Sequence, residues 1–249
     1  MRLAFEKVGV GYDGRRVVAG VDLTIDDGEV VALIGPNGSG KSSLVRAAAG
    51  LLAHDGAIRF GAGPRAAARI GYMPQDEGRR PALTALEVVL LGRMRGLGFR
   101  VADADLDAAE AMMAELAIAG FAERLVGELS GGQRQLVYLA QALVAEPDAL
   151  LLDEPTSALD MRHQLDVLAS VRRLTRSRGL ACLLVLHDLN AAARFSDRIA
   201  VLHEGRLACC APPEEALTAA RIAEVFGVEA AIGRAPDGRP TVTPLAAIG

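Results

Sequence analysis

The sequence contains no tryptophan, and aromatic residues make up only 4% of its 249 residues. It also lacks a basic excess, because 27 lysine and arginine residues stand against 31 aspartate and glutamate residues, for a formal net charge of -4. Proteins that bind nucleic acids usually present a basic face or aromatic side chains on which bases stack. The composition therefore argues against a nucleic-acid-binding protein, and we expect no nucleic-acid partner.

Long hydrophobic runs are missing as well, although 51% of the residues are hydrophobic. The longest apolar run, LACLLVL at 180–186, has the length of a strand and falls well short of the roughly 18 residues of a membrane-spanning helix. The first residues alternate as a strand does and contain no hydrophobic segment of a signal peptide. We therefore expect a soluble protein that stays where it is made and buries a sizeable core.

Cysteine and lysine are both scarce. Cys182, Cys209 and Cys210 form an odd set without the spacing of a metal site, so we expect free thiols packed as small hydrophobic residues in a reducing compartment. Only Lys7 and Lys41 are lysines among the 27 basic residues. Because arginine is the usual cation of this chain, a lysine at a chemically suggestive position is informative.

Segments with the pattern of strands and of helices alternate along the chain. The expected strands are residues 2–8, 16–25, 29–34, 57–60, 69–73, 149–153, 180–186 and 198–203. The first expected helix begins after a glycine-rich turn and ends at about residue 52. The other expected helices cover residues 84–95, 103–119, 130–146, 161–177 and 188–195. In the tail, PPEEAL opens a short helix and APDGRP suggests a hairpin turn. The alternation predicts an α/β fold with a parallel sheet that carries its ligand at the carboxyl ends of the strands.

A phosphate-binding loop follows the apolar strand 29–34. The pattern G-x-x-x-x-G-K-[ST] is matched by Gly35, Pro36, Asn37, Gly38, Ser39, Gly40, Lys41 and Ser42. The glycines allow backbone N–H groups to converge on phosphate oxygens at the start of a helix. Lys41 would contact the β- and γ-phosphates, and Ser42 would bind Mg²⁺.

Two acids end the apolar strand 149–153. Asp153 at such a strand end, beside a phosphate loop, is suited to hold Mg²⁺ directly or through water. Glu154 is the natural general base for an attacking water. Without the loop, these acids would more simply terminate a strand; with the loop, they predict phosphate chemistry.

The residues LSGGQ at 129–133 open a helix. Ser130 and Gln133 fit a capping box, in which each side chain satisfies a backbone N–H of the first turn. Gly131 and Gly132 are not explained by capping, because glycine weakens a helix interior by up to roughly 1 kcal/mol relative to alanine. We therefore predict that something approaches this backbone closely.

These ordered motifs resemble ATP-binding cassette ATPases over nearly the whole chain. LSGGQ matches the signature of that family, and Tyr12 matches the aromatic residue that stacks on adenine. Gln75 matches the glutamine that senses Mg²⁺ and links to the membrane partner, and His187 matches the switch histidine at the γ-phosphate. The family's loop across the dimer interface is matched by Ser157, Ala158, Leu159 and Asp160.

The resemblance implies one ATPase domain over residues 1–249. A RecA-like P-loop NTPase core with an N-terminal antiparallel β subdomain would be formed by about residues 1–83 and 147–249. A helical subdomain with the signature would be formed by about residues 84–146. It implies ATP and Mg²⁺ as cofactors, with Ser43 also at the nucleotide. The implied magnesium residues are Ser42, Gln75 and Asp153, and the implied catalytic residues are Lys41, Gln75, Glu154 and His187. In this family two chains stack head to tail, so Ser130, Gly131, Gly132 and Gln133 would bind the ATP of a second copy.

A cassette without its own membrane span resembles the ATPase subunits of bacterial importers. Its implied partners are a second copy, integral-membrane permease subunits facing residues 76–85 and the helical insert, and indirectly a substrate-binding protein. Its implied place is the cytoplasmic face of the inner membrane, as a peripheral subunit.

Several stretches narrow the resemblance to importers of ferric siderophores, haem and vitamin B12. These are GRMRGLGFR, GGQRQ, LDMRHQLDVL, HDLNAAARFSDRIAVLHEGR and the closing GRPTVTPL. The short closing hairpin and the LDMRHQ stretch favour a ferric siderophore. We expect His163 in that stretch to be a solvated or interface residue of a helix rather than a metal ligand. The alternative is a soluble cassette ATPase of iron–sulfur cluster assembly, which would not co-purify with a membrane partner.

Overall fold

A six-stranded sheet forms the centre of the computed structural model, which describes residues 2–12, 14–61, 69–75, 82–94, 101–157 and 159–248. The strand order is β5-β6-β7-β3-β8-β9. The strands are β5 (Ile70–Met73), β6 (Ala149–Asp153), β7 (Ala181–Val185), β3 (Val30–Ile34), β8 (Arg198–His203) and β9 (Arg206–Ala211). Every residue of β3, β6 and β7 is buried, as their continuous apolar sequences predict for a sheet covered on both faces.

The prediction of a parallel sheet is correct for five strands and wrong for the sixth. The pairs β5·β6, β6·β7, β7·β3 and β3·β8 are parallel, whereas β9 pairs antiparallel with β8. Glu204 and Gly205 join these two strands with φ angles of 47° and 74°, which a tight two-residue hairpin requires. Strand β9 was not predicted, because its small residues give only a weak alternation of apolar and polar side chains.

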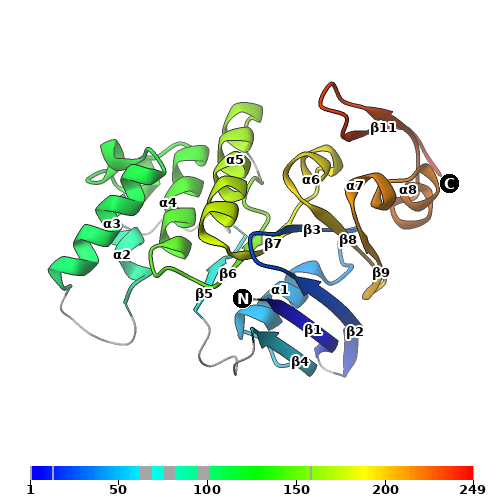
Figure 1. The fold of residues 1–249 in the computed structure, drawn as a ribbon, viewed down its shortest axis with the longest axis horizontal. Coiled ribbons are helices and arrows are strands. Elements are labelled where there is room, and N and C mark those ends of the chain that lie inside the picture. The colour runs from blue at the N-terminus through cyan, green and yellow to red at the C-terminus, as the bar shows by residue number, and fades with distance from the viewer. Residues whose placement is uncertain are drawn as a thin grey trace.

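A second, antiparallel sheet lies beside the first, in the order β2-β1-β4 (Figure 1). It contains β1 (Leu3–Tyr12), β2 (Arg15–Ile25) and β4 (Asp55–Phe60). Its apolar side chains, including the fully buried Phe5 and Phe60, share one core with helix α1 (Lys41–Ala49) and one face of the central sheet. The expected N-terminal antiparallel β subdomain is therefore present.

Three helices pack together at the opposite side of the molecule in Figure 1. They are α2 (Ala85–Leu91), α3 (Asp103–Glu115) and α4 (Gly131–Leu143), with short 3₁₀ turns at Ala119–Phe121 and Val126–Glu128 between α3 and α4. Each ends three or four residues before its predicted end. Their apolar faces join the second large core, which also covers the other face of the central sheet together with α5 (Met161–Arg178). The division at about residues 84 and 146 stays a prediction.

The chain ends in a hairpin that packs on helix α6 (Leu189–Phe195). The hairpin consists of β10 (Val228–Arg234) and β11 (Pro240–Ala247). It is preceded in the sequence by α7 (Pro213–Ala216) and α8 (Ala219–Phe226). The short helix at PPEEAL and the turn at APDGRP were predicted, while α8 was not. Strand β11 thus packs on the helix that follows β7.

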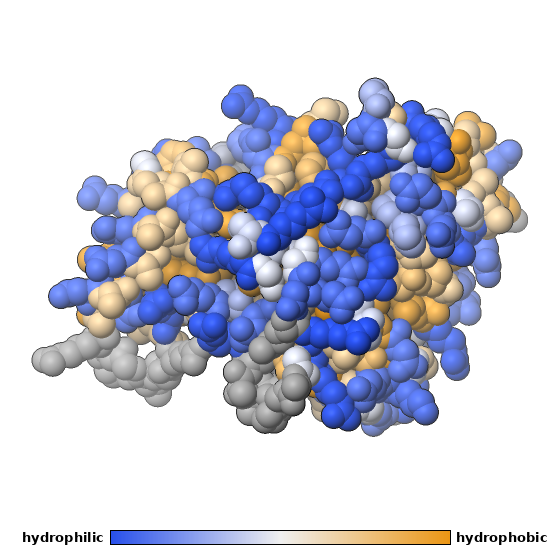
Figure 2. Space-filling view, in the orientation of Figure 1, coloured by the Kyte–Doolittle hydropathy of each residue, from blue (hydrophilic) through white to orange (hydrophobic). Residues whose placement is uncertain are grey.

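None of the helices in the described ranges is long and apolar enough to cross a membrane. On the face shown in Figure 2, hydrophobic residues form separate patches with hydrophilic residues between them. All three cysteines are free, and burial raises the pKa of the Cys182 thiol to about 12. That thiol therefore packs as a small hydrophobic residue, as predicted.

Candidate functional site

The phosphate loop connects β3 to α1, as its motif predicts. Gly40 precedes the helix with φ of 103°, and a Cβ there would lie 2.7 Å from the side chain of Val18, so only glycine fits this position. Lys41 is 5% exposed, and its Nζ donates to the carbonyl oxygens of Gly35 and Pro36 at 2.9 Å each. The loop is thus folded around a buried ammonium group.

Electrostatic forces on this ammonium group oppose one another. Burial lowers the pKa of Lys41, and the carboxylates of Glu154 and Asp153 act in the opposite direction. The acids at the end of β6 therefore lie close enough to the loop for their charges to act on Lys41. The structure brings the two predicted motifs into one site.

Asp153 and Ser42 form a set of oxygen atoms suited to a divalent cation. The Ser42 hydroxyl donates to Asp153 Oδ1 at 3.1 Å, while Oδ2 is buried without a hydrogen-bond partner in the described part of the chain. Burial raises the pKa of this carboxyl, and the bond from Ser42 partly opposes that shift. An unpaired buried carboxylate oxygen next to a hydroxyl fits Mg²⁺, which prefers such hard oxygen ligands.

Three neighbouring strands bring Gln75, Glu154 and His187 together. These residues follow β5, β6 and β7, which are adjacent in the sheet, at the carboxyl ends where the sequence predicts the ligand. Gln75 Nε2 donates to Glu154 Oε2 at 2.8 Å, and His187 Nε2 lies 2.5 Å from Glu154 Oε1. The side chain of Glu154 is 12% exposed, so both oxygens of a nearly buried carboxylate are held by neighbours.

The signature begins α4 with the predicted capping box. Gln133 N–H donates to Ser130 Oγ at 3.3 Å, and Ser130 N–H donates to Gln133 Oε1 at 3.1 Å. Helix α4 packs on α2, α3, α5 and β5, whereas the helix of the phosphate loop, α1, packs on β1, β2, β6 and β7. The two motifs with glycine at or before the start of a helix therefore belong to different parts of the molecule.

The remaining predicted residues lie around these groups. Tyr12 is 41% exposed at the end of β1, and its hydroxyl is 3.3 Å from Ser43 Oγ, beside the phosphate loop. Ser157 donates its hydroxyl to the carbonyl of Glu154 at 3.1 Å, and Asp160 caps α5. Ala158, which belongs to the same predicted interface loop, lies outside the described residues.

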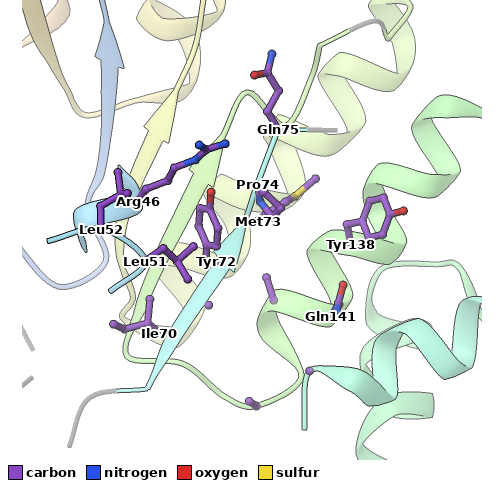
Figure 3. Close-up of a pocket in the computed structure, with 14 residues that line it drawn as sticks. Arg46, Leu51, Leu52, Ile70, Tyr72, Met73, Pro74, Gln75, Tyr138 and Gln141 are labelled. Carbon is purple, nitrogen blue, oxygen red and sulfur yellow. The ribbon is translucent and has the colours of Figure 1, made fainter. Parts of the chain in front are cut away.

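A cavity of about 750 Å³ opens beside Gln75 (Figure 3). Its lining comes from α1, β5 and α4, and Arg46 lies next to Tyr72 within it. A hydrogen bond between the Arg46 guanidinium and the Tyr72 side chain raises the pKa of Arg46, so this cation is held at the wall. The sequence analysis missed these lining residues; the aromatic residue of YMPQ, just before Gln75, was the available signal. Residues 76–81 of the stretch predicted to face a permease lie outside the described residues.

The fold and the site define a nucleotide hydrolase of the phosphate-loop class. A lysine-bearing loop after one parallel strand faces an aspartate and a glutamate after another, which is the arrangement that phosphoryl transfer to water requires. A family model described as ABC transporter matches residues 18–157. The chain belongs to the ABC transporter family, and it is an ATPase.

Known proteins resemble nearly all of the chain. The hemin import ATP-binding protein HmuV of Rhodopseudomonas palustris (strain BisA53) is 39% identical over 97% of this chain and 94% of its own length. The cobalamin import ATP-binding protein BtuD of Halobacterium salinarum (strain R1) is 38% identical over 98% of this chain and 64% of its own length. A solved structure described as a metal-chelate type ABC transporter in an inward-facing conformation has a TM-score of 0.86 and 26% identity, over 98% of this chain and 97% of that one.

Proposed function

We propose that this chain is the ATP-hydrolysing subunit of an importer for a metal chelate and that it works as a homodimer. The observation that carries the proposal is the Glu154 carboxylate, held by Gln75 and His187 at the strand ends beside the phosphate loop. The relatives named for hemin and cobalamin import support the importer class.

Each site residue has a role that its position supports. Lys41 and the backbone N–H groups of the loop bind the β- and γ-phosphates, with Tyr12 against the adenine. Ser42, Asp153 and Gln75 hold Mg²⁺, which neutralises phosphate charge when bound. Glu154 accepts a proton from the attacking water, and His187 orients that carboxylate and contacts the γ-phosphate.

The second nucleotide contact comes from a second copy. Ser130 and the N–H groups of Gly131 and Gly132 lie at the start of a helix, where an anion is stabilised. The packing of α4 and α1 on different elements supports this arrangement, in which the signature of one chain would contact the ATP of its partner. The loop from Ser157 to Asp160 would then run along the dimer interface.

Permease subunits are the proposed membrane partners. The cavity beside Gln75 supports this proposal, because a partner that docked there would contact a residue that also touches Glu154, so docking and chemistry would share one side chain. The chain would act at the cytoplasmic face of the inner membrane, and a substrate-binding protein would deliver cargo to the permease without touching this subunit.

The proposed cargo is an iron or cobalt chelate. Names of relatives point to hemin and cobalamin, and the closing hairpin with the LDMRHQ stretch points to a ferric siderophore. Hemin is the first cargo to test, because relatives at 37–39% identity across nearly the whole chain are named for it. Iron–sulfur cluster assembly, the alternative, is not favoured by any of these names.

Uptake in a strain that lacks this gene tests the proposal. We expect the wild-type chain to restore uptake of labelled hemin, ferric siderophore or vitamin B12, and Glu154→Gln to restore none, because the amide cannot accept the proton of water. The matched control is Glu123→Gln, an exposed acid outside the site. Full uptake with Glu154→Gln, or no dependence on the gene for any of the three cargos, contradicts the proposal.

A further inference from the structure

Gly132 of the signature has a reason to be glycine within its own chain. A Cβ at Gly132 would lie 2.3 Å from Cδ2, 2.4 Å from Cγ and 2.6 Å from Cβ of His163. Carbon atoms in contact are separated by roughly 3.5–4.0 Å, so any side chain at residue 132 would collide with the histidine. The close approach that the sequence predicts therefore occurs, and it comes from the first turn of α5.

Asp160 fixes the histidine ring in this place. Nδ1 of His163 lies 2.8 Å from Oδ1 and 2.9 Å from Oδ2 of Asp160, and the same carboxylate accepts the His163 backbone N–H at 2.9 Å. These bonds lower the pKa of the Asp160 carboxyl. With Nδ1 tied to Asp160, the opposite edge of the ring faces Gly132 and cannot turn away without breaking the pair.

The contact joins the two halves of the proposed mechanism. Ser157 bonds to the carbonyl of Glu154, Asp160 ends the same loop, and His163 carries the contact on to Gly132. Contacts at both ends of this loop thus lie between the acid that would serve the chain's own ATP and the helix start that would serve its partner's ATP. Among the described residues, no cluster of three metal-ligating side chains includes His163.

We propose that His163 is a positioning residue that sets the first turn of α4 against the loop from Ser157 to Asp160. The proposal rests on the proposed homodimer, in which that turn binds the partner's ATP. Small displacements of groups that position a substrate lower rates strongly. Loss of the ring therefore lowers turnover, while binding of ATP to a single chain stays unchanged because His163 touches none of the phosphate loop.

A double-mutant cycle between residues 132 and 163 tests the inference in the complex with its permease. We expect Gly132→Ala to lower ATP turnover roughly tenfold or more and His163→Ala to lower it roughly three- to thirtyfold. Gly132→Ala combined with His163→Gly, the double variant of this cycle, recovers to the level of His163→Gly alone, because that change also removes Cβ of residue 163, which would lie 2.6 Å from the new methyl group. His163→Asn, whose amide can donate to Asp160, retains more turnover than His163→Ala. The control is Gly120→Ala, where a Cβ meets nothing within 4 Å, and it keeps wild-type turnover.

Two results would overturn the inference. If the double variant stays as slow as Gly132→Ala, the glycine serves the partner's ATP and not the histidine. If His163→Ala turns over ATP at the wild-type rate, the ring positions nothing. Thermal unfolding of the four nucleotide-free chains separates these results from a failure of the proposed function, because the coupling of residues 132 and 163 in stability does not require a dimer. Absence of turnover in the wild-type complex instead counts against the function.

Discussion

Glu154 adopts a left-handed backbone conformation, with φ of 54°. This conformation costs an L-residue roughly 1–2 kcal/mol, mainly because of its Cβ. Local bonds hold the residue there: Ser157 donates to its carbonyl, and Gln75 and His187 hold its carboxylate. Strain of this kind is common where a side chain must point in one direction for function.

The strain predicts an unusual order of stability at residue 154. We expect Glu154→Gly to be more stable than Glu154→Ala by about 1 kcal/mol, since both lose the carboxylate but only glycine accepts a positive φ freely. Urea unfolding of the two nucleotide-free variants measures the difference. Equal stabilities, or a more stable alanine variant, would show that the backbone of Glu154 is not strained.

The motifs single out individual candidate residues where the chemistry depends on short spacing, and the roles of these residues stay predictions. Lys41, Ser42, Asp153 and Glu154 lie in two short segments, and the sheet order brings the segments together as expected. The contact between His163 and Gly132 could not be predicted, because it depends on how α5 packs against α4. The sequence predicted only that some group lies close to the signature glycines. The family resemblance implied that this group is the ATP of a partner chain.

At the scale of elements, helix α6 is held by the C-terminal hairpin. Asn190 accepts the N–H of Val242 at 2.8 Å and donates to its carbonyl at 3.2 Å, so one side chain satisfies both backbone groups of a buried residue. Arg239 donates to the carbonyls of Ala193 and Ser196 at the other end of the helix. The hairpin thus holds both ends of the helix that follows His187.

Removal of the Asn190 side chain tests this attachment. We expect Asn190→Ala to lower the free energy of unfolding by roughly 1–3 kcal/mol, because Val242 is left with an unpaired donor and acceptor. Thr243→Ala, an exposed neighbour on β11, serves as the control with a change within about 0.5 kcal/mol. Equal small effects in urea unfolding would mean that water replaces Asn190 without loss.

Elements were predictable where their pattern was strong. The strands β6 and β8 have the predicted limits, since each is a short apolar run between clear breaks. Helix ends were predicted too late, because apolar periodicity continues past α2, α3 and α4 into residues that pack as turns and irregular chain. The antiparallel strand β9 and helix α8 were missed, since packing against β8 and β10 determines them more than local pattern does.

At the scale of the whole molecule, two hydrophobic cores lie on opposite faces of one sheet. One contains the antiparallel sheet and the helix of the phosphate loop, and the other contains the helices with the signature. The two helix starts that are proposed to bind phosphate therefore belong to different cores. This separation is the structural argument for a dimer in which two chains complete each other's sites.

A trapped dimer is the expected consequence. With ATP, Glu154→Gln should elute as a dimer in size-exclusion chromatography, since it binds ATP but does not hydrolyse it. Adding Ser130→Arg should keep the chain monomeric while ATP binding stays near the wild-type level, and Lys41→Ala should lose ATP binding itself. Ser130→Ala, which removes the cap but adds no bulk, is the matched control. Equal loss of monomer ATP binding in Ser130→Arg would refute the shared site.

The phosphate loop folds around the Lys41 ammonium group, which donates hydrogen bonds to the carbonyl oxygens of Gly35 and Pro36. If Lys41 binds the phosphates as proposed, nucleotide entry exchanges the partners of one side chain and does not require the loop to fold. The entropy cost of ordering the loop falls on the folding of the chain, once, and not on each round of ATP binding. For a subunit that binds and releases nucleotide in every cycle, affinity is thereby set by contacts to the phosphates and not by loop closure.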